Sequence, residues 1–278
     1  MPDTAINQES FGGGQPLAGK HFLLTRPANE FSCELRDDSS PLMEDLEKLG
    51  AKIHVIHPLL IQPVDQGGYF DQALRSIGLF DWIVFTSVHG VEATFERMAE
   101  MKIDLRDYRD VKLAAIGPRT ASHTALRFRS PDLTAEESIQ ESLALAFSNV
   151  KDEKILYFRA NLARNVLPTL LREKGAIVQD IVAYNIVRNL QPGDLPKEVP
   201  DGFLFTSSES ASVTIDLLKQ EGDESWLNVA PLFCIGPMTA KKVMSYGYAP
   251  CAVKKNFNST GLVELVVSYF TKGAGFNE

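Results

Sequence analysis

The residues best placed for chemistry are hydroxyl side chains that directly follow apolar runs. Thr86-Ser87 comes after Trp82–Phe85, and Thr206-Ser207 comes after Phe203–Phe205. If the runs are strands, these hydroxyls stand where a helix begins, and hydroxyls and free backbone N–H groups at helix N-termini bind anions. Open α/β sheets also bind ligands at the carboxyl ends of their strands. The pattern therefore indicates anion binding.

Two Gly-Pro motifs repeat this arrangement, at 117–120 and 236–239, and they end in Thr120 and Thr239. Taken singly, each motif is explained as ordinary helix capping, because Ser and Thr cap many helices and Pro is common at the first helical position. Taken together, four paired motifs support a shared anion-binding cleft equally well. The residues alone leave both interpretations open.

Arg26 and Arg159 occupy matching positions after their own apolar runs. They could pair with substrate carboxylates or form surface salt bridges, and the sequence does not decide between these roles. Tyr184 lies in a β-like run, where a tyrosine usually packs with its hydroxyl in water. It could also donate a proton to a leaving group.

Apolar runs alternate with helical patterns along the whole chain. Leu42, Leu46 and Leu49 have helical spacing, and so do Leu262, Leu265 and Tyr269 near the end. This alternation predicts parallel sheets covered by helices on both faces. The expected strands are Phe22–Leu24, Ile53–Ile56, Trp82–Phe85, Leu113–Ile116, Ile155–Phe158, Ile177–Tyr184, Phe203–Phe205 and Leu232–Ile235.

The chain also repeats itself. The Thr-Ser pair and the Gly-Pro-x-Thr-Ala motif recur in the same order and at nearly the same separation in two halves, roughly 20–150 and 151–278. The first half carries a polar loop insertion between Arg26 and Pro41. Two copies are too few for a solenoid, so we expect a pseudo-symmetric protein of two lobes.

Composition excludes several classes of protein. The 278 residues carry a net charge of −8 and show no basic stripe, so nucleic acid is not an expected partner. No apolar run is long enough for a membrane span, and residues 1–18 are expected to be a flexible tail. The three cysteines form no CxxC motif, which fits a reducing cytoplasm. No metal site and no nucleotide or hydrolase motif is expected.

The ordered set of motifs resembles the uroporphyrinogen-III synthase family over about residues 20 to 270. The resemblance is carried by Leu23–Pro27, Phe85–Ser87, Ile116–Ala121, Val182–Tyr184, Phe205–Ser208 and Ile235–Ala240. It implies two α/β lobes with parallel sheets flanked by helices, joined by a two-stranded antiparallel β linker. Domain one would be 19–54 with 190–278, domain two 62–180, and the linker strands 54–61 and 181–188.

The resemblance also implies an activity. The enzyme would be a cyclising lyase that converts hydroxymethylbilane to uroporphyrinogen III with loss of water and inversion of ring D, without a cofactor. It would be a cytoplasmic monomer, with at most transient contact with hydroxymethylbilane synthase. Tyr184 would be catalytic, and the residues expected to bind substrate are Arg26, Thr86, Ser87, Thr120, Arg159, Thr206, Ser207 and Thr239.

The bilane has eight carboxylates, so the negative charge of the chain would have to be offset locally, by helix N-termini and by Arg26, Arg159 and Arg164. The alternative is a two-lobed sensor that binds an anionic metabolite and closes. Fold physics supports both functions, because a fold does not fix a function. We favour the synthase because Tyr184 would lie beside the lobe junction, and because no additional output module is visible.

Overall fold

The computed structural model describes residues 14–31, 41–191, 193–253, 255 and 257–272. Cys33, the first thirteen residues of the expected tail and most of the expected loop insertion lie outside these residues. Within them the chain divides into two compact units. Unit 1 takes the described residues of 1–28, 36–60 and 188–278, and unit 2 takes those of 29–35 and 61–187. The domain and linker limits expected above remain predictions.

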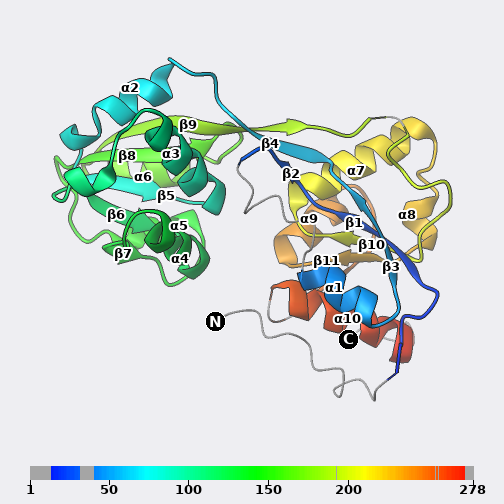
Figure 1. The fold of residues 1–278 in the computed structure, drawn as a ribbon. Coiled ribbons are helices and arrows are strands. Elements are labelled where there is room, and N and C mark those ends of the chain that lie inside the picture. Colours follow the sequence, from blue (N-terminus) through cyan, green and yellow to red (C-terminus); the bar gives the residue numbers. More distant parts are fainter. Residues whose placement is uncertain (1–13, 32–40, 192, 254, 256, 273–278) are drawn as a thin grey trace. The chain divides into compact units, whose positions relative to one another are not determined.

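Unit 1 is built on a five-stranded sheet in the order β12-β11-β10-β1-β3, and its strands pair in parallel. Its elements are β1 (His21–Thr25), α1 (Pro41–Lys48), β3 (Lys52–Ile56), β10 (Gly202–Phe205), α7 (Ser208–Glu221), α8 (Trp226–Val229), β11 (Leu232–Cys234), α9 (Pro237–Ser245), β12 (Pro250–Ala252) and α10 (Ser259–Lys272). Figure 1 shows these elements in the blue and the yellow-to-red parts of the chain.

Unit 2 holds most of a seven-stranded sheet in the order β2-β4-β9-β8-β5-β6-β7. Its strands from β9 to β7 pair in parallel. The strands are β2 (Ala28–Asn29), β4 (Leu59–Pro63), β5 (Trp82–Phe85), β6 (Lys112–Ala115), β7 (Leu133–Thr134), β8 (Lys154–Ala160) and β9 (Ile177–Arg188). The helices are α2 (Tyr69–Arg75), η2 (Ile77–Leu79), α3 (Val88–Glu100), η3 (Leu105–Asp107), α4 (Pro118–Arg127), α5 (Gln140–Ala146) and α6 (Val166–Glu173).

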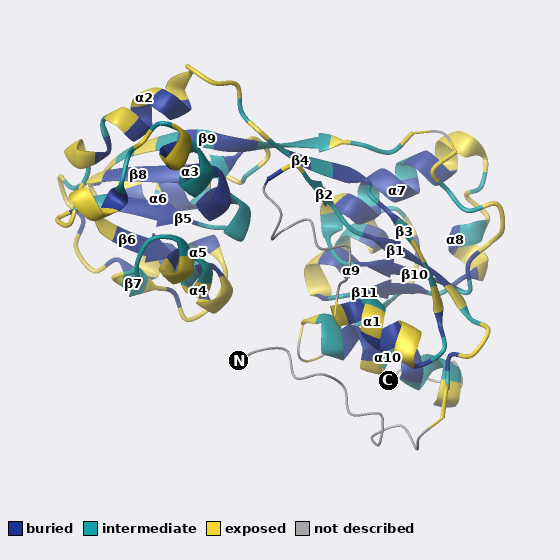
Figure 2. Ribbon diagram, viewed as in Figure 1, coloured by how far each residue is buried: buried dark blue, intermediate teal, exposed yellow. Residues whose placement is uncertain are grey.

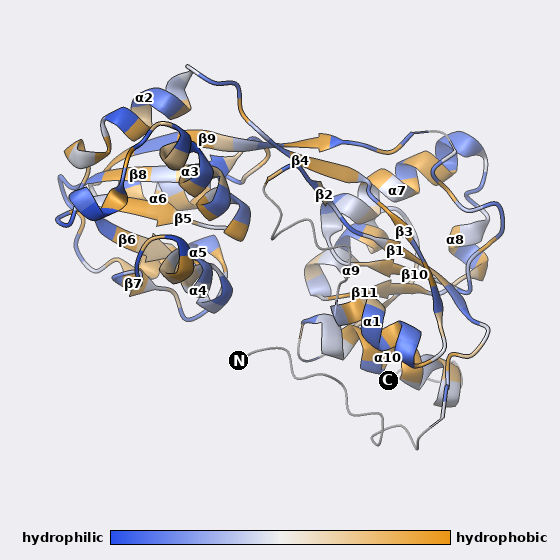
Figure 3. Ribbon diagram, in the orientation of Figure 1, coloured by the Kyte–Doolittle hydropathy of each residue, from blue (hydrophilic) through white to orange (hydrophobic). Residues whose placement is uncertain are grey.

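Each sheet is apolar on both faces because helices cover both. In unit 1, Phe22 and Leu24 pack with α1 and α10 on one face, whereas Leu23 packs with α7 and α9 on the other. In unit 2, Ile83 and Val84 divide in the same way between α2 and α3 on one face and α5 and α6 on the other. The central strands are accordingly buried in Figure 2 and hydrophobic in Figure 3. The expected parallel sheets are confirmed.

All eight expected strands are present, with ends that differ by up to four residues. The run expected as one strand at 54–61 is divided into β3 and β4, which end and begin around Pro58. Proline has no N–H group to continue a ladder, which explains a break there. Leu17, expected in the flexible tail, is fully buried, and its N–H donates to the Leu49 carbonyl at 3.0 Å. The packed part of unit 1 therefore begins before residue 19.

Candidate active site

When the strands are matched by the sequence repeat, the five strands of unit 1 and the five parallel strands of unit 2 are arranged alike, and each set has one point where the direction of winding reverses. In unit 1, β1 lies between β3 and β10. In unit 2, β8 lies between β9 and β5. The chain winds outward in opposite directions from these central pairs, and ligands bind open α/β sheets in the crevice outside the carboxyl ends of such strands. The candidate site residues Arg26, Thr206 and Ser207 follow β1 and β10, and Arg159, Thr86 and Ser87 lie at or after the ends of β8 and β5.

In unit 2 the candidate site residues form hydrogen bonds with one another. The Ser87 Oγ accepts a hydrogen bond from the Gly90 N–H at 3.0 Å and so caps α3. The same oxygen lies 2.8 Å from the Tyr184 hydroxyl. Beside it, the Thr86 hydroxyl lies 3.1 Å from the hydroxyl of Tyr157, a fully buried residue of β8. One serine hydroxyl and one threonine hydroxyl thus each contact a tyrosine hydroxyl at one end of the sheet.

A β-bulge brings Tyr184 to this place. On β9, Val182 pairs with Arg159 and Tyr184 pairs with Ala160, so Ala183 is an extra residue with no counterpart on β8. Bulges re-aim side chains and are common next to active sites. Tyr184 is 5% exposed, and burial raises the pKa of its phenol above the ordinary value. The phenol therefore keeps its proton at neutral pH and can donate it.

The first turn of α3 also holds His89, which the sequence reasoning missed. Its ring centroid lies 6.0 Å from that of Tyr184, and its buried Nδ1 has no hydrogen-bond partner among the described residues. Burial, and secondarily the charge of Arg119, lower the pKa of His89 to about 4. The imidazole is therefore neutral at pH 7. His89 could have been identified from the sequence by its position just after Thr86-Ser87, because the first turn of a helix that follows a parallel strand faces the ligand crevice.

The Gly-Pro motifs begin α4 and α9, with Gly117 and Gly236 in the N-cap position. Both glycines are in extended backbone, which any residue adopts, so the need for glycine is one of space. A Cβ on Gly117 would lie 2.0 Å from the Ser138 Oγ. Thr120 and Thr239 occupy matching places in the first turns, and both are nearly buried.

In unit 1 the hydroxyls bond to their own neighbours. Thr206 donates to the Thr25 carbonyl at 2.7 Å, which ties the end of β10 to the end of β1. The Ser207 Oγ accepts from the Ser210 N–H at 3.1 Å and caps α7, and it donates to the Ser210 hydroxyl. The serine of each Thr-Ser pair therefore caps a helix, and in unit 2 the pair also contacts the hydroxyls of Tyr157 and Tyr184.

Comparison with known proteins decides the family. The family model described as uroporphyrinogen-III synthase HemD matches residues 40–272.

The chain belongs to the uroporphyrinogen-III synthase family.

Relatives agree with this assignment. A uroporphyrinogen-III synthase from Synechococcus elongatus is 28% identical over 245 residues, which cover 81% of this chain and 86% of the relative. Two solved structures share the fold. A mutant uroporphyrinogen III synthase from the extremely thermophilic bacterium Thermus thermophilus has a TM-score of 0.63 at 14% identity, covering 91% of this chain and 99% of its own. A uroporphyrinogen-III synthetase from Helicobacter pylori has a TM-score of 0.61 at 17% identity, covering 90% and 99%.

The family expected from the motifs is thus confirmed, and with it the activity of a cyclising lyase of tetrapyrrole biosynthesis that acts on hydroxymethylbilane. The sensor alternative is set aside. Across the described residues, no helix combines the length and apolar character needed to cross a membrane. In the same part of the chain, no cluster of His, Cys, Asp or Glu is arranged to hold a metal ion.

The arginines expected to meet substrate already have partners. The Arg159 Nε lies 3.0 Å from the Asp180 carboxylate, and its Nη1 donates to the Ala163 carbonyl at 3.1 Å. Arg164 pairs with Glu141 at 3.1 Å on the surface. The backbone N–H of Arg26 donates to the Ile56 carbonyl at 3.0 Å, and its carbonyl lies 3.0 Å from the His57 Nδ1. For Arg159 and Arg164, binding a substrate carboxylate would mean exchanging one anionic partner for another.

Proposed function

We propose that Tyr184 is the acid that assists departure of the terminal hydroxyl of hydroxymethylbilane, with Ser87 as its hydrogen-bond partner. The proposal is carried by one observation, the 2.8 Å contact between the Tyr184 hydroxyl and the Ser87 Oγ at the strand ends of unit 2. The phenol is protonated at neutral pH, as an acid must be before it donates, although burial raises its pKa and so makes it a weaker acid than a tyrosine in water.

The reaction releases as many protons as it consumes, so a single acid can donate a proton early in the reaction and regain one at the end. The phenol proton goes to the terminal hydroxyl, the carbon–oxygen bond breaks, and water leaves behind an azafulvene cation. The Ser87 Oγ already accepts from the Gly90 N–H, so its own proton is free to donate to the phenolate oxygen. After ring D is inverted through a spiro intermediate and the ring closes, the pyrrole carbon loses a proton and the phenol is restored. The sum is loss of one water, with no change in oxidation state.

The carboxylates of the bilane are, in this proposal, bound by the starts of helices in each unit. The first turns of α3 and α4 in unit 2 and of α7 and α9 in unit 1 offer backbone N–H groups and hydroxyls, which bind carboxylates well. Thr86, Thr120, Thr206 and Thr239 are the side chains we assign to this role, with Ser207. Arg26 and Arg159 would contribute by exchanging their present partners for substrate carboxylates.

His89 has a separate role in the proposal. A neutral imidazole with an unpartnered buried nitrogen is suited to accept a hydrogen bond, and the pyrrole N–H groups of the substrate are donors. Such a bond would hold one ring of the bilane beside Tyr184. Because positioning of the chain decides which isomer forms, we expect His89 to affect the product ratio as well as the rate.

We further propose a monomeric enzyme without a cofactor, with at most a transient contact with hydroxymethylbilane synthase. The reaction eliminates water and rearranges carbon–carbon bonds, so its stoichiometry calls for no redox partner or group carrier. Sedimentation of the purified protein, alone and with hydroxymethylbilane synthase, tests the monomer and the contact.

The activity is tested by an isomer assay. Hydroxymethylbilane is generated in place from porphobilinogen by its deaminase, the products are oxidised, and uroporphyrins I and III are separated by chromatography. We expect isomer III to replace isomer I in proportion to the amount of this protein added. If folded protein yields isomer I alone, the activity is excluded. If isomer III forms equally well with Tyr184→Phe, the acid role is excluded while the activity stands.

A further inference from the structure

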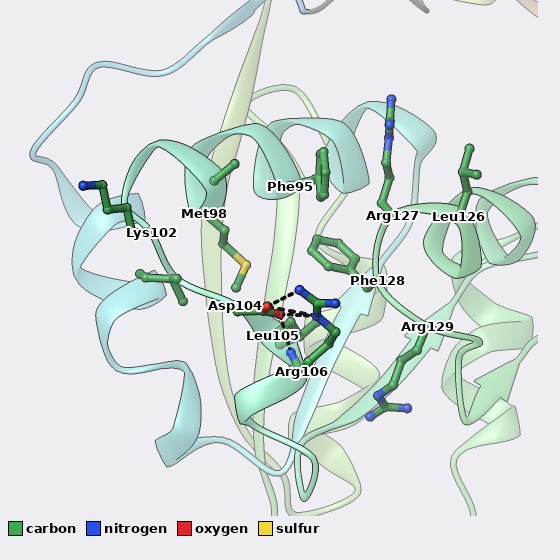
Figure 4. A pocket seen from close by; sticks show the side chains of 12 residues that line it. Phe95, Met98, Lys102, Asp104, Leu105, Arg106, Leu126, Arg127, Phe128 and Arg129 are labelled. Carbon is green, nitrogen blue, oxygen red and sulfur yellow. Dashed lines mark hydrogen bonds and ion pairs between the residues drawn. The ribbon is translucent and has the colours of Figure 1, made fainter.

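Unit 2 contains a cavity of about 600 Å³ away from the residues discussed so far. It lies against the second half of α3, the η3 turn and the end of α4, whereas the candidate active site involves the first turns of these helices. Figure 4 shows Phe95 and Met98 projecting from α3, with Phe128 facing them. Cavities of this volume hold small organic ligands.

The lining combines an apolar surface with positive charge. Phe95, Met98 and Phe128 supply aromatic and thioether surface, which suits a flat ring. The charged lining residues are Lys102, Asp104, Arg106, Arg127 and Arg129. Four cations against one carboxylate stand out in a chain whose net charge is −8.

The arginines of this group are held in place by neighbours. Arg106 pairs with Asp104 at 2.5 Å, and Arg129 pairs with Asp132 at 2.8 Å. Arg127 contacts Glu92 at 2.6 Å and lies over the Phe95 ring at 4.9 Å. Lys102 is different, because within the described residues its ammonium has no ion pair or hydrogen bond. Its exposed side chain points away from Phe95, Met98 and Phe128 in Figure 4, so it would have to turn toward the cavity to meet a ligand there.

Lys102 also has a strained backbone. Its φ is +58°, in the left-handed region that normally suits glycine. It follows the end of α3, where the N–H of Ile103 returns to the Met98 carbonyl at 2.8 Å, a helix end that usually places glycine at this position. When the two repeats are aligned on Thr86 and Thr206, Lys102 coincides with Gly222, which has φ +86° at the end of α7. Unit 1 thus uses glycine where unit 2 keeps a lysine.

The repeat also shows that the fold does not require arginines at these positions. Aligned in the same way, Arg106 coincides with Trp226. Aligned on the Gly-Pro motifs, Arg127 and Arg129 coincide with Tyr246 and Tyr248. These rings pack on the apolar cluster under α7 and α9, and Tyr248 is 8% exposed. Unit 1 places aromatic rings where unit 2 places arginines around a cavity.

We propose that this cavity is a second binding site, for a small molecule with a flat apolar ring and a carboxylate. The ring would pack on Phe95, Met98 and Phe128, and the carboxylate would meet Lys102. Strained residues cluster at functional sites, and Lys102 is one of two described non-glycine residues with positive φ, the other being Asp152. The site is separate from the proposed cyclisation chemistry and does not depend on it.

The test uses 2-naphthoate as the probe, with the neutral 2-naphthylmethanol as its matched counterpart. Calorimetric titration of the full chain should give saturable binding of 2-naphthoate and much weaker binding of the alcohol. Lys102→Gln should weaken 2-naphthoate binding about tenfold, the size of a lost charge-assisted hydrogen bond. Lys102→Gly should weaken binding equally, while relief of backbone strain raises the thermal midpoint by about 2–4 °C.

Controls separate this site from nonspecific binding. Lys241→Gln removes an exposed charge from unit 1 and should leave binding unchanged. Leu126→Glu adds a negative charge at an exposed position of the lining, without disturbing a packed side chain, and should also weaken binding. Isomer III formation should be unchanged in all four variants. The proposal would be overturned if Lys102→Gln and Leu126→Glu left the affinity for 2-naphthoate unchanged. It would also be overturned if the parent chain bound 2-naphthylmethanol as tightly as 2-naphthoate.

Discussion

The Tyr184 hydroxyl and the Ser87 Oγ lie 2.8 Å apart, although one residue is on β9 and the other caps α3. The serine oxygen also accepts the Gly90 N–H, so one atom joins the start of a helix to the proposed acid. The position of the phenol is therefore linked to the same helix turn that is proposed to bind substrate. A change at Ser87 should affect both stability and catalysis.

Ser87→Ala and Ser207→Ala form a matched pair, because each serine caps a helix after a strand. Each variant should lose about 1 kcal/mol of unfolding free energy, the usual value of an N-cap side chain. Only Ser87→Ala also removes a partner of Tyr184, so its kcat should fall about tenfold further than that of Ser207→Ala. Urea unfolding and the isomer assay measure the two effects. Equal losses of kcat would show that the serine contributes only a cap.

Tyr184→Phe should lower turnover more than any single threonine substitution. Removal of a general acid costs about 10²-fold or more. Thr86→Ala, Thr120→Ala and Thr206→Ala each remove one of many donors, and each should cost about tenfold or less. The comparison is made at saturating substrate, with folding checked by circular dichroism. Losses of one size across all four variants would argue that the tyrosine only helps to position the substrate.

His89 should make stability depend on pH. Its pKa is lowered to about 4 in the folded chain, against an ordinary value near 6.5. Between these values the unfolded chain binds more protons than the folded chain, so the free energy of unfolding falls as the pH is lowered. From pH 7 to pH 5 this residue should account for about 2 kcal/mol of lost stability.

His89→Phe keeps a ring beside Tyr184 and removes the titrating group. Urea unfolding at pH 7 and pH 5 should therefore show a smaller difference for this variant than for the parent chain. His54→Phe is the control, since that ring is exposed and its Nε2 lies 3.2 Å from the Asp194 carbonyl. If the free energy of unfolding of the parent chain and of His89→Phe changed equally between pH 7 and pH 5, the imidazole would be solvated in the folded chain rather than buried in its neutral form.

The sheets were the most predictable part of the fold. Runs such as Ile83–Phe85 are apolar at every position because both faces are covered, and that leaves a clear signal in the sequence. Short edge strands such as Leu133–Thr134 and Pro250–Ala252 carry no such pattern, because one side of each faces away from the sheet. They are defined by backbone pairing with strands distant in the sequence.

The site could be predicted as separate motifs but not as an arrangement. Thr86-Ser87 and Tyr184 were identified from their positions after or within strands. Their contact depends on the pairing of β9 with β8 and on the bulge at Ala183, and a bulge leaves no local sequence signal. The ion pair of Arg159 with Asp180 was equally hidden, because the two residues meet only through strand pairing.

The Gly-Pro motifs give a final prediction, because their two glycines differ in surroundings. A Cβ on Gly117 would lie 2.0 Å from the Ser138 Oγ and 3.0 Å from its Cβ, whereas a Cβ on Gly236 would meet the Phe257 ring at an ordinary 3.5 Å. Gly117→Ala should therefore cost about 1–3 kcal/mol more than Gly236→Ala, the usual cost of overpacking. Both positions are N-caps, so the difference between the variants isolates the contact with Ser138. Adding Ser138→Gly to Gly117→Ala should recover most of the loss in urea unfolding, and failure to do so would assign the need for glycine to something other than this side chain.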